Sequence, residues 1–282
     1  MTATFYDRLA PYYHLLYGDW ESSVAKQGEA LARLLREAGV VPGDHVLDAA
    51  SGIGTQTLGL LTHGYRLTAS DISAGAIERL KVELSRRAFQ ASAHVDDLRT
   101  LNRTSSESMA AVIACDNSIP HLLSDAELLQ AFRSCYRCLR PGGVAVFSVR
   151  DYAAIERVNP DVRPYGLRYE AGSRFLAVQV WEWDNNHYDL RVYLTSESAE
   201  GVCETQVLRS RYYAVSIERL LSLLAQAGFA GVERRDDVLF QPVLLGRRPN
   251  AGLPDSSAPC TAKTFLARSI PTVTLAIISP LE

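Results

Sequence analysis

Two aspartates each follow a short apolar run, and each could bind a ligand at the end of a strand. Asp48 closes the run that begins at His45 and leads into a turn with Gly52 and Gly54, and Asp71 closes the next apolar run. Glycines in such a turn let the backbone approach a ligand, and an acid at the end of the following strand suits two ribose hydroxyls. Either acid alone could cap a helix, but their order favours a ligand site.

The spacing of the glycines restricts the kind of ligand. A dinucleotide fingerprint G-x-G-x-x-G would need a third glycine where the chain has Thr57. We therefore predict a ligand without a pyrophosphate. Asp48 would orient the turn and attract a cationic group of that ligand.

Further polar groups stand in the stretch CDNSIPHLLSD, which begins at Cys115 and follows the apolar run Met109–Ala114. The polar residues of this strand tip are Asp116, Asn117, Ser118 and His121. Ligands of open α/β sheets bind at the carboxyl ends of parallel strands, so this tip is a second candidate wall of the same site. His121 could instead cap the helix that starts at Ser124.

The elements that must position these residues alternate along the chain. The predicted strands cover 45–49, 65–71, 91–95, 110–114, 144–149, 232–236 and 243–247. Helical spacing of apolar residues predicts the helices at 22–38, 73–87, 125–139 and 216–227. This alternation is typical of a parallel sheet covered by helices on both faces.

The pattern changes between Asp151 and Tyr213. Alternating runs cover 175–183, 188–194 and 207–213, with a turn at 184–186, and they predict an antiparallel insertion. Trp181 and Trp183 share one face of the first run, so we expect them to pack in the core.

The totals exclude several classes of protein. The 282 residues are 47% hydrophobic, enough for one domain with an insertion, and a net charge of -3 argues against nucleic acid and anionic membranes as partners. Five cysteines without framework spacing and the absence of a signal-peptide pattern predict a cytoplasmic protein. The histidines are scattered, so we predict no metal site, and core packing for the pair Cys135 and Cys138.

Five motifs now carry a resemblance. VLDAASGIGTQ, SDIS, VDDLRTL, AVIACDNSIPHL and LRPGG, in this order, resemble the class I S-adenosylmethionine-dependent methyltransferases. The branch that looks most similar is that of the glycine and sarcosine N-methyltransferases, with alanine at Ala50, a C-x-G-N-S-x-x-H-L type strand tip, and an R-N-Y motif where this chain has Arg150-Asp-Tyr152. The resemblance runs from about Tyr6 to Arg247.

The resemblance implies a Rossmann-like, seven-stranded, mostly parallel sheet with an antiparallel β insertion after the fifth strand. It implies a helical lid over 1–40, a cofactor-binding core over 41–150, a substrate insertion over 151–213 and the rest of the core over 214–248. We expect 249–282 to be a disordered tail that is dispensable for catalysis.

The resemblance also implies roles for single residues. These residues and the acids and glycines described above form one expected site for S-adenosylmethionine. It consists of Tyr6, Tyr13, Asp48, Ala50, Gly52, Gly54, Asp71, Ile72, Asp97, Leu98, Cys115 and His121. The expected residues for the acceptor are Asn117, Arg150 and Tyr193. The chain departs from the branch at Ser23, where the family has a lid arginine.

The reaction expected from this resemblance is methyl transfer to the amine of glycine, sarcosine or a related amino acid. Arg150 would bind the carboxylate of that acceptor, although it could also be a surface residue at a strand end. Two alternatives stay open: a methyltransferase for another small molecule, such as an O-methylated carboxylate or natural product, and a non-catalytic S-adenosylmethionine-binding protein. A small-molecule acceptor is the expected partner, and a homo-oligomer is possible.

Overall fold

The structure, a computed structural model, describes residues 2–250. Its main sheet consists of β1 (His45–Asp48), β2 (Arg66–Asp71), β3 (Ser92–Val95), β4 (Met109–Ala114), β5 (Leu139–Ser148), β10 (Ala230–Arg235) and β11 (Val243–Arg247). The strand order is β10-β11-β5-β4-β1-β2-β3. Strand β11 pairs antiparallel with both β5 and β10, and the other neighbouring strands of this sheet pair parallel.

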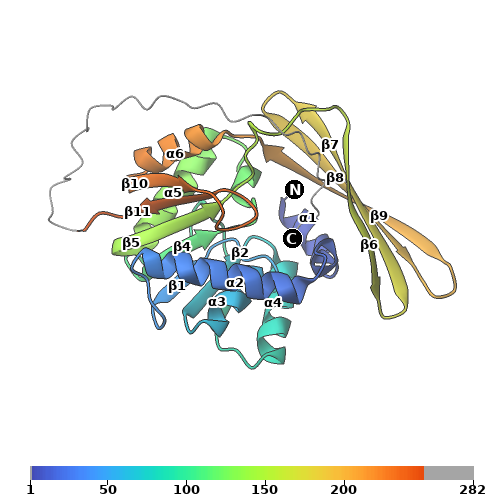
Figure 1. The fold of residues 1–282 in the computed structure, drawn as a ribbon, viewed down its shortest axis with the longest axis horizontal. Coiled ribbons are helices and arrows are strands. Elements are labelled where there is room, and N and C mark those ends of the chain that lie inside the picture. Colours follow the sequence, from blue (N-terminus) through green and yellow to red (C-terminus); the bar gives the residue numbers. More distant parts are fainter. Residues whose placement is uncertain (1, 251–282) are drawn as a thin grey trace.

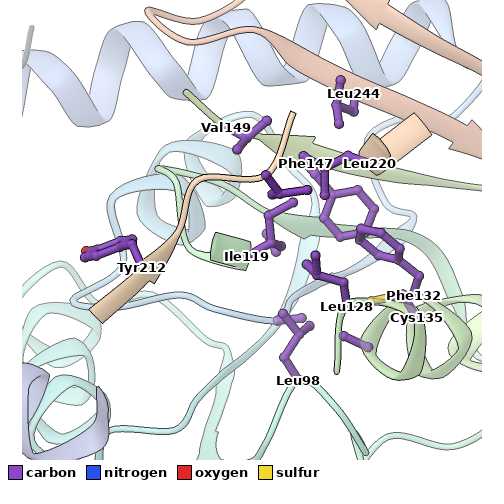
Figure 2. Packing of buried hydrophobic residues seen from close by; sticks show 14 of the residues in the cluster. Leu98, Ile119, Leu128, Phe132, Cys135, Phe147, Val149, Tyr212, Leu220 and Leu244 are labelled. Atoms are coloured by element: carbon purple, nitrogen blue, oxygen red, sulfur yellow. The ribbon is translucent and has the colours of Figure 1, made fainter. Parts of the chain in front are cut away.

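Helices cover both faces of this sheet. They are α1 (Thr2–Leu9), α2 (Trp20–Glu37), α3 (Thr55–Thr62), α4 (Ala74–Arg86), α5 (Asp125–Cys138) and α6 (Ile217–Gln226), with 3₁₀ turns η1 (Tyr13–Leu16) and η2 (Ile119–His121). Helices α2, α3 and α4 pack on one face, and α5 and α6 pack on the other. Figure 2 shows Phe132 of α5 beside Phe147 of β5, with ring centroids 5.0 Å apart.

The second sheet is the insertion. It contains β6 (Asp161–Glu170), β7 (Ser173–Asp184), β8 (His187–Glu197) and β9 (Cys203–Tyr213), all antiparallel and in sequence order. One face of β7, β8 and β9 joins the main core through residues such as Trp181, Tyr188 and Val192. Helix α1 lies between this sheet and the main sheet (Figure 1), in contact with β9 and α4.

The predicted fold class is confirmed: a seven-stranded, mostly parallel sheet with an antiparallel insertion after β5. Trp181 is buried as predicted, and Cys135 and Cys138 are free thiols in the core. Strand β6 was not predicted, because its sequence, DVRPYGLRYE, contains proline, glycine and two arginines. The predicted tail lies outside the described residues, apart from Pro249 and Asn250. Among residues 2–250, no helix is both long enough and apolar enough to span a bilayer.

Candidate active site

A cavity of about 360 Å³ opens at the carboxyl ends of β1, β2 and β4, beneath α1 and η1. Ten of the predicted ligand residues line it: Tyr6, Tyr13, Ala50, Gly52, Asp71, Ile72, Asp97, Leu98, Cys115 and His121. The structure does not place Asp48 and Gly54 in the cavity wall, nor the expected acceptor residues Asn117, Arg150 and Tyr193. The segments that meet here come from the first half of the chain, as expected for adjacent parallel strands.

Asp71 and the glycine turn form one hydrogen-bonded unit. Asp71 Oδ2 accepts a hydrogen bond from the backbone N–H of Gly52 at 2.8 Å, and Oδ1 accepts from the N–H of Ser73 at 2.8 Å. Gly54 has φ of +100°, and a Cβ there would lie 2.3 Å from Leu80 Cδ1, so only glycine fits. Burial raises the pKa of Asp71, although these two N–H groups oppose that shift. The acid is thus held in place at the cavity wall.

Asp48 supports the turn from below. It is fully buried, and its Oδ2 accepts a hydrogen bond from the Thr57 hydroxyl at 2.7 Å. Burial raises the pKa of Asp48 to about 7. The residue that replaces the third glycine of a dinucleotide motif therefore anchors this acid. The structure gives Asp48 a positioning role in place of the predicted ligand contact.

The N-terminal segment closes the cavity from above. Tyr6 Oη and His121 Nε2 are 2.8 Å apart, and Asp7 Oδ1 accepts hydrogen bonds from Ser73 Oγ and the N–H of Gly75, at 2.7 and 2.9 Å. Ser23, at the position of the family's lid arginine, is buried and donates to the Asp19 carbonyl. Hydrogen bonds therefore attach the N-terminal helix α1 to the loop after Asp71.

His121 belongs to the cavity and does not cap α5, because Ser124 takes that role by accepting from the N–H of Glu127. The His121 ring packs on Tyr212 of β9, with centroids 4.0 Å apart. Burial, together with the charge of Arg150, lowers the pKa of His121 to about 3. The imidazole is neutral at physiological pH.

The strand tip after β4 is bent by two consecutive left-handed residues. Asp116 and Asn117 both have φ of +60°, a conformation that Asp and Asn tolerate better than most residues. Asn117 Nδ2 donates to the Tyr152 hydroxyl at 2.9 Å, and its Oδ1 accepts from the backbone N–H of Arg150 at 3.0 Å. The amide of Asn117 therefore holds the end of β5.

Arg150 stands without an acidic partner. No hydrogen bond or ion pair of its guanidinium exists within residues 2–250, and its Cζ lies 5.3 Å from the centre of the Trp181 ring. The aromatic rings that surround this charge belong to Tyr152, Tyr165, Tyr188 and Tyr212. Asp151 points away and pairs with Arg234 at 2.8 Å, as the alternation of side chains along the chain predicts.

Tyr193 does not join this group. It is 38% exposed and lies on the face of β8 opposite to Tyr188 and Val192, both of which are buried. Tyr188 is the β8 tyrosine at the site: its hydroxyl lies 3.1 Å from that of Tyr152. The role expected for Tyr193 came from the resemblance alone, and a shift of one residue along a strand exchanges its two faces.

Comparison with known proteins agrees with a cofactor site at the glycine turn and Asp71. Residues 46–143 match the family model described as a methyltransferase domain. The chain carries a class I S-adenosylmethionine-dependent methyltransferase domain. The predicted resemblance to this class is confirmed.

Curated relatives of the methyltransferase domain match part of the chain. The glycine/sarcosine N-methyltransferase of Parasynechococcus marenigrum is 29% identical over 134 residues, 48% of this chain and 46% of that protein. The enzyme of the same name from Halorhodospira halochloris is 28% identical over 137 residues, 49% of this chain and 50% of that protein. The chain thus spans about half the length of the curated relatives that it matches.

Solved structures share the fold over a longer stretch. DesVI of Streptomyces venezuelae superposes with a TM-score of 0.71 at 18% identity, over 86% of this chain and 98% of that one. The sugar N-methyltransferase KedS8 from Streptoalloteichus superposes with a TM-score of 0.69 at 20% identity, over 80% of this chain and 88% of that one. These similarities establish the architecture around the methyltransferase domain.

Several residues at the cavity of the methyltransferase domain were not predicted. Among them are Tyr17, Arg99 and Glu127, all in the cavity wall; Asp116, a polar residue of the predicted strand tip, also lines the cavity, but no role was predicted for it. Asp97 accepts hydrogen bonds from the Arg99 guanidinium through both carboxylate oxygens, and Arg99 also pairs with Glu127 at 2.6 Å. Asp116 could have been recognised from the Asp-Asn pair at a strand end, a frequent left-handed combination.

Proposed function

We propose that the protein binds S-adenosylmethionine in this cavity and methylates the amine of a small amino acid such as glycine or sarcosine. The observation that carries the acceptor class is the unpaired Arg150 guanidinium in its ring of aromatic side chains. A partly buried arginine such as Arg150, enclosed by aromatic rings and without a carboxylate partner, is costly unless a ligand supplies that carboxylate. Its planar fork matches a carboxylate through two parallel hydrogen bonds. Half-length similarity to glycine/sarcosine N-methyltransferases supports the same acceptor.

The side chains of the cavity fit S-adenosylmethionine. Four acids line the wall, namely Asp71, Asp97, Asp116 and Glu127, against one arginine, Arg99, whose charge is already paired. Such an acidic and aromatic wall suits a cationic ligand without phosphates. Asp71 would bind the ribose hydroxyls, Asp97 and Leu98 would contact the adenine end, and Tyr6 and Tyr13 would cover the charged sulfur.

When bound, S-adenosylmethionine supplies a methyl group already activated by its positive sulfur. The protein therefore needs to orient the acceptor and exclude water, and orientation alone is worth about 7–11 kcal/mol in favourable cases. Arg150 would fix the carboxylate of the acceptor, and the buried hydroxyl chain of Tyr152 and Tyr188 would hold the arginine's surroundings rigid. The neutral His121 would hold the Tyr6 hydroxyl in position.

An acceptor screen with labelled S-adenosylmethionine tests the proposal. Glycine, sarcosine and dimethylglycine come first, with acetate and small alcohols as acceptors that lack an amine. We expect labelled product with the amino acids only. Labelled methyl esters or ethers would indicate an O-methyltransferase, and tight cofactor binding without any product would indicate a non-catalytic binding protein.

A further inference from the structure

Asp116 is the carboxylate of the cavity whose partners leave one oxygen free. Its Oδ2 accepts hydrogen bonds from the hydroxyls of Tyr17 at 2.7 Å and Tyr13 at 3.4 Å. Within the described part of the chain, Oδ1 has no hydrogen-bond donor and neither oxygen has a cationic partner in contact. The other acids at the wall are occupied: backbone N–H groups hold Asp71, and Arg99 binds Asp97 and Glu127.

The positive charge that acts on Asp116 is that of Arg150. It stabilises the ionised form of Asp116 through space without forming an ion pair with it. Arg150 is not among the residues that line the cavity, so the site combines a free carboxylate oxygen in the cavity wall with an unpaired guanidinium whose charge acts on that carboxylate. A zwitterion, with a carboxylate and an ammonium group on neighbouring carbons, is complementary to both.

The surroundings of Asp116 favour it as the group that handles a proton. Burial raises the pKa of Asp116 above its usual value, whereas the hydrogen bonds from Tyr17 and Tyr13 and the charge of Arg150 oppose this shift. Burial raises the pKa of both tyrosines well above their usual value, so they stay neutral donors. The titratable groups that face Asp116 are Tyr6, Tyr13, Tyr17, Cys115, Arg150 and Tyr165.

We propose that Asp116 binds the ammonium group of the acceptor and accepts its proton before methyl transfer. The inference deepens the proposed function and rests on it. In this step an N–H bond of the ammonium breaks, the proton moves to Asp116 Oδ1, and the electron pair of that bond stays on nitrogen. The neutral amine is then the nucleophile, the methylated product carries the positive charge, and Asp116 releases its proton to water.

The test compares Asp116→Asn with a matched control. Asp237→Asn makes the same change at an exposed residue with φ of +62°, so it reproduces the backbone conformation away from the cavity. Calorimetry measures binding of S-adenosylmethionine and S-adenosylhomocysteine, and kinetics measure kcat/KM for glycine and sarcosine between pH 6 and pH 10. We expect Asp116→Asn to bind S-adenosylhomocysteine, which has no sulfonium charge, like the wild type and to lose about 100-fold in kcat/KM at neutral pH.

The pH profile supplies a second readout that a purely structural role would not change. In Asp116→Asn, kcat/KM should rise with pH only as the free amine forms in solution. In the wild type and Asp237→Asn, kcat/KM should instead fall at low pH as Asp116 becomes protonated, which gives the pH profile an acid limb. Tyr17→Phe keeps the carboxylate but removes one hydrogen bond to its ionised form, so it should move that limb to higher pH.

Three results would overturn the inference. Weaker binding of both cofactor forms by Asp116→Asn would assign the residue to the methionine end of the cofactor. An unchanged kcat/KM and pH profile in that variant would remove Asp116 from the reaction while leaving the amine-methylating function intact. A wild-type protein that methylates no amine would overturn the proposed function and this inference together.

Discussion

The two walls of the cavity are built in different ways. At the ends of β1 and β2, the polar side chain of Asp71 is held by backbone N–H groups of Gly52 and Ser73, within 19 residues in sequence. At the ends of β4 and β5, side chains hold one another across longer distances. Asn117 and Tyr152 are 35 residues apart, and His121 and Ser210 are 89 residues apart.

This difference separates a wall set by local loops from one set by packing. Backbone N–H groups sit at positions fixed by the turn, so the first wall tolerates many changes elsewhere. The second wall depends on how the insertion sheet docks, since Trp181, Tyr188 and Tyr212 all come from it. We therefore expect changes at the first wall to alter cofactor affinity and changes at the second to alter use of the acceptor.

The largest expected effect comes from Arg150→Lys. Lysine keeps the charge but loses the planar fork, so kcat/KM for glycine should fall by about 100-fold, mainly through KM. Binding of S-adenosylhomocysteine should stay at the wild-type level. The matched control is Arg157→Lys, an exposed arginine 4.8 Å from the neighbouring Trp183 ring. Equal losses of cofactor and acceptor binding in Arg150→Lys would show that the two walls are not separate.

Asp71→Ala should produce the next largest effect, on the other wall. It removes the carboxylate expected to bind the ribose, and affinity for S-adenosylmethionine should fall by about 10- to 100-fold in calorimetry. Asp96→Ala is the control: Asp96 also accepts from backbone N–H groups, those of Asp97, Asn102 and Arg103, but does not line the cavity. Unchanged affinity in Asp71→Ala would refute the ribose assignment.

The buried acid beneath the first wall predicts a dependence of stability on pH. The pKa of Asp48 is about 7 in the folded state and near its ordinary value of 3.8 when unfolded, so the folded state binds more protons between these values. Stability should therefore fall as pH rises from 5 to 8. Denaturant titrations should show that Asp48→Asn reduces this fall by about 2–3 kcal/mol.

Thr57→Val is the comparison for that experiment, because it removes the hydroxyl donor but leaves the acid in place. It should keep the fall of stability with pH. An equally flat profile in Thr57→Val and Asp48→Asn would mean that another group is responsible for the dependence.

The smallest effects should distinguish the two faces of β8. Tyr193→Phe should leave kcat/KM and unfolding free energy unchanged, because this side chain points away from the cavity. Tyr188→Phe removes a hydroxyl bonded to Tyr152 and should cost about 0.5–1.5 kcal/mol of unfolding free energy. A strong loss of acceptor use in Tyr193→Phe would restore the role that the sequence assigned to it.

The sequence by itself determined the fold class and most of the first wall. Alternating apolar runs, the turn with Gly52 and Gly54, and the acid at Asp71 are local patterns, and the carboxyl ends of adjacent parallel strands meet by geometry. The sequence also indicated that the Asp-Asn pair after β4 belongs to the site. It did not predict the left-handed backbone of the pair or the position of the Asp116 side chain in the cavity wall.

Only the tertiary structure decided the second wall. Strand β6 went unpredicted and Tyr193 was placed on the wrong face, because pairing register is fixed by docking and one residue of shift exchanges the faces of a strand. The lack of a partner for Arg150 has the same origin, because it depends on which side chains from distant segments arrive beside it. Asp48 differs, since its hydrogen-bond donor, Thr57, is only nine residues along the chain; what the sequence did not indicate is that this contact replaces one with the ligand.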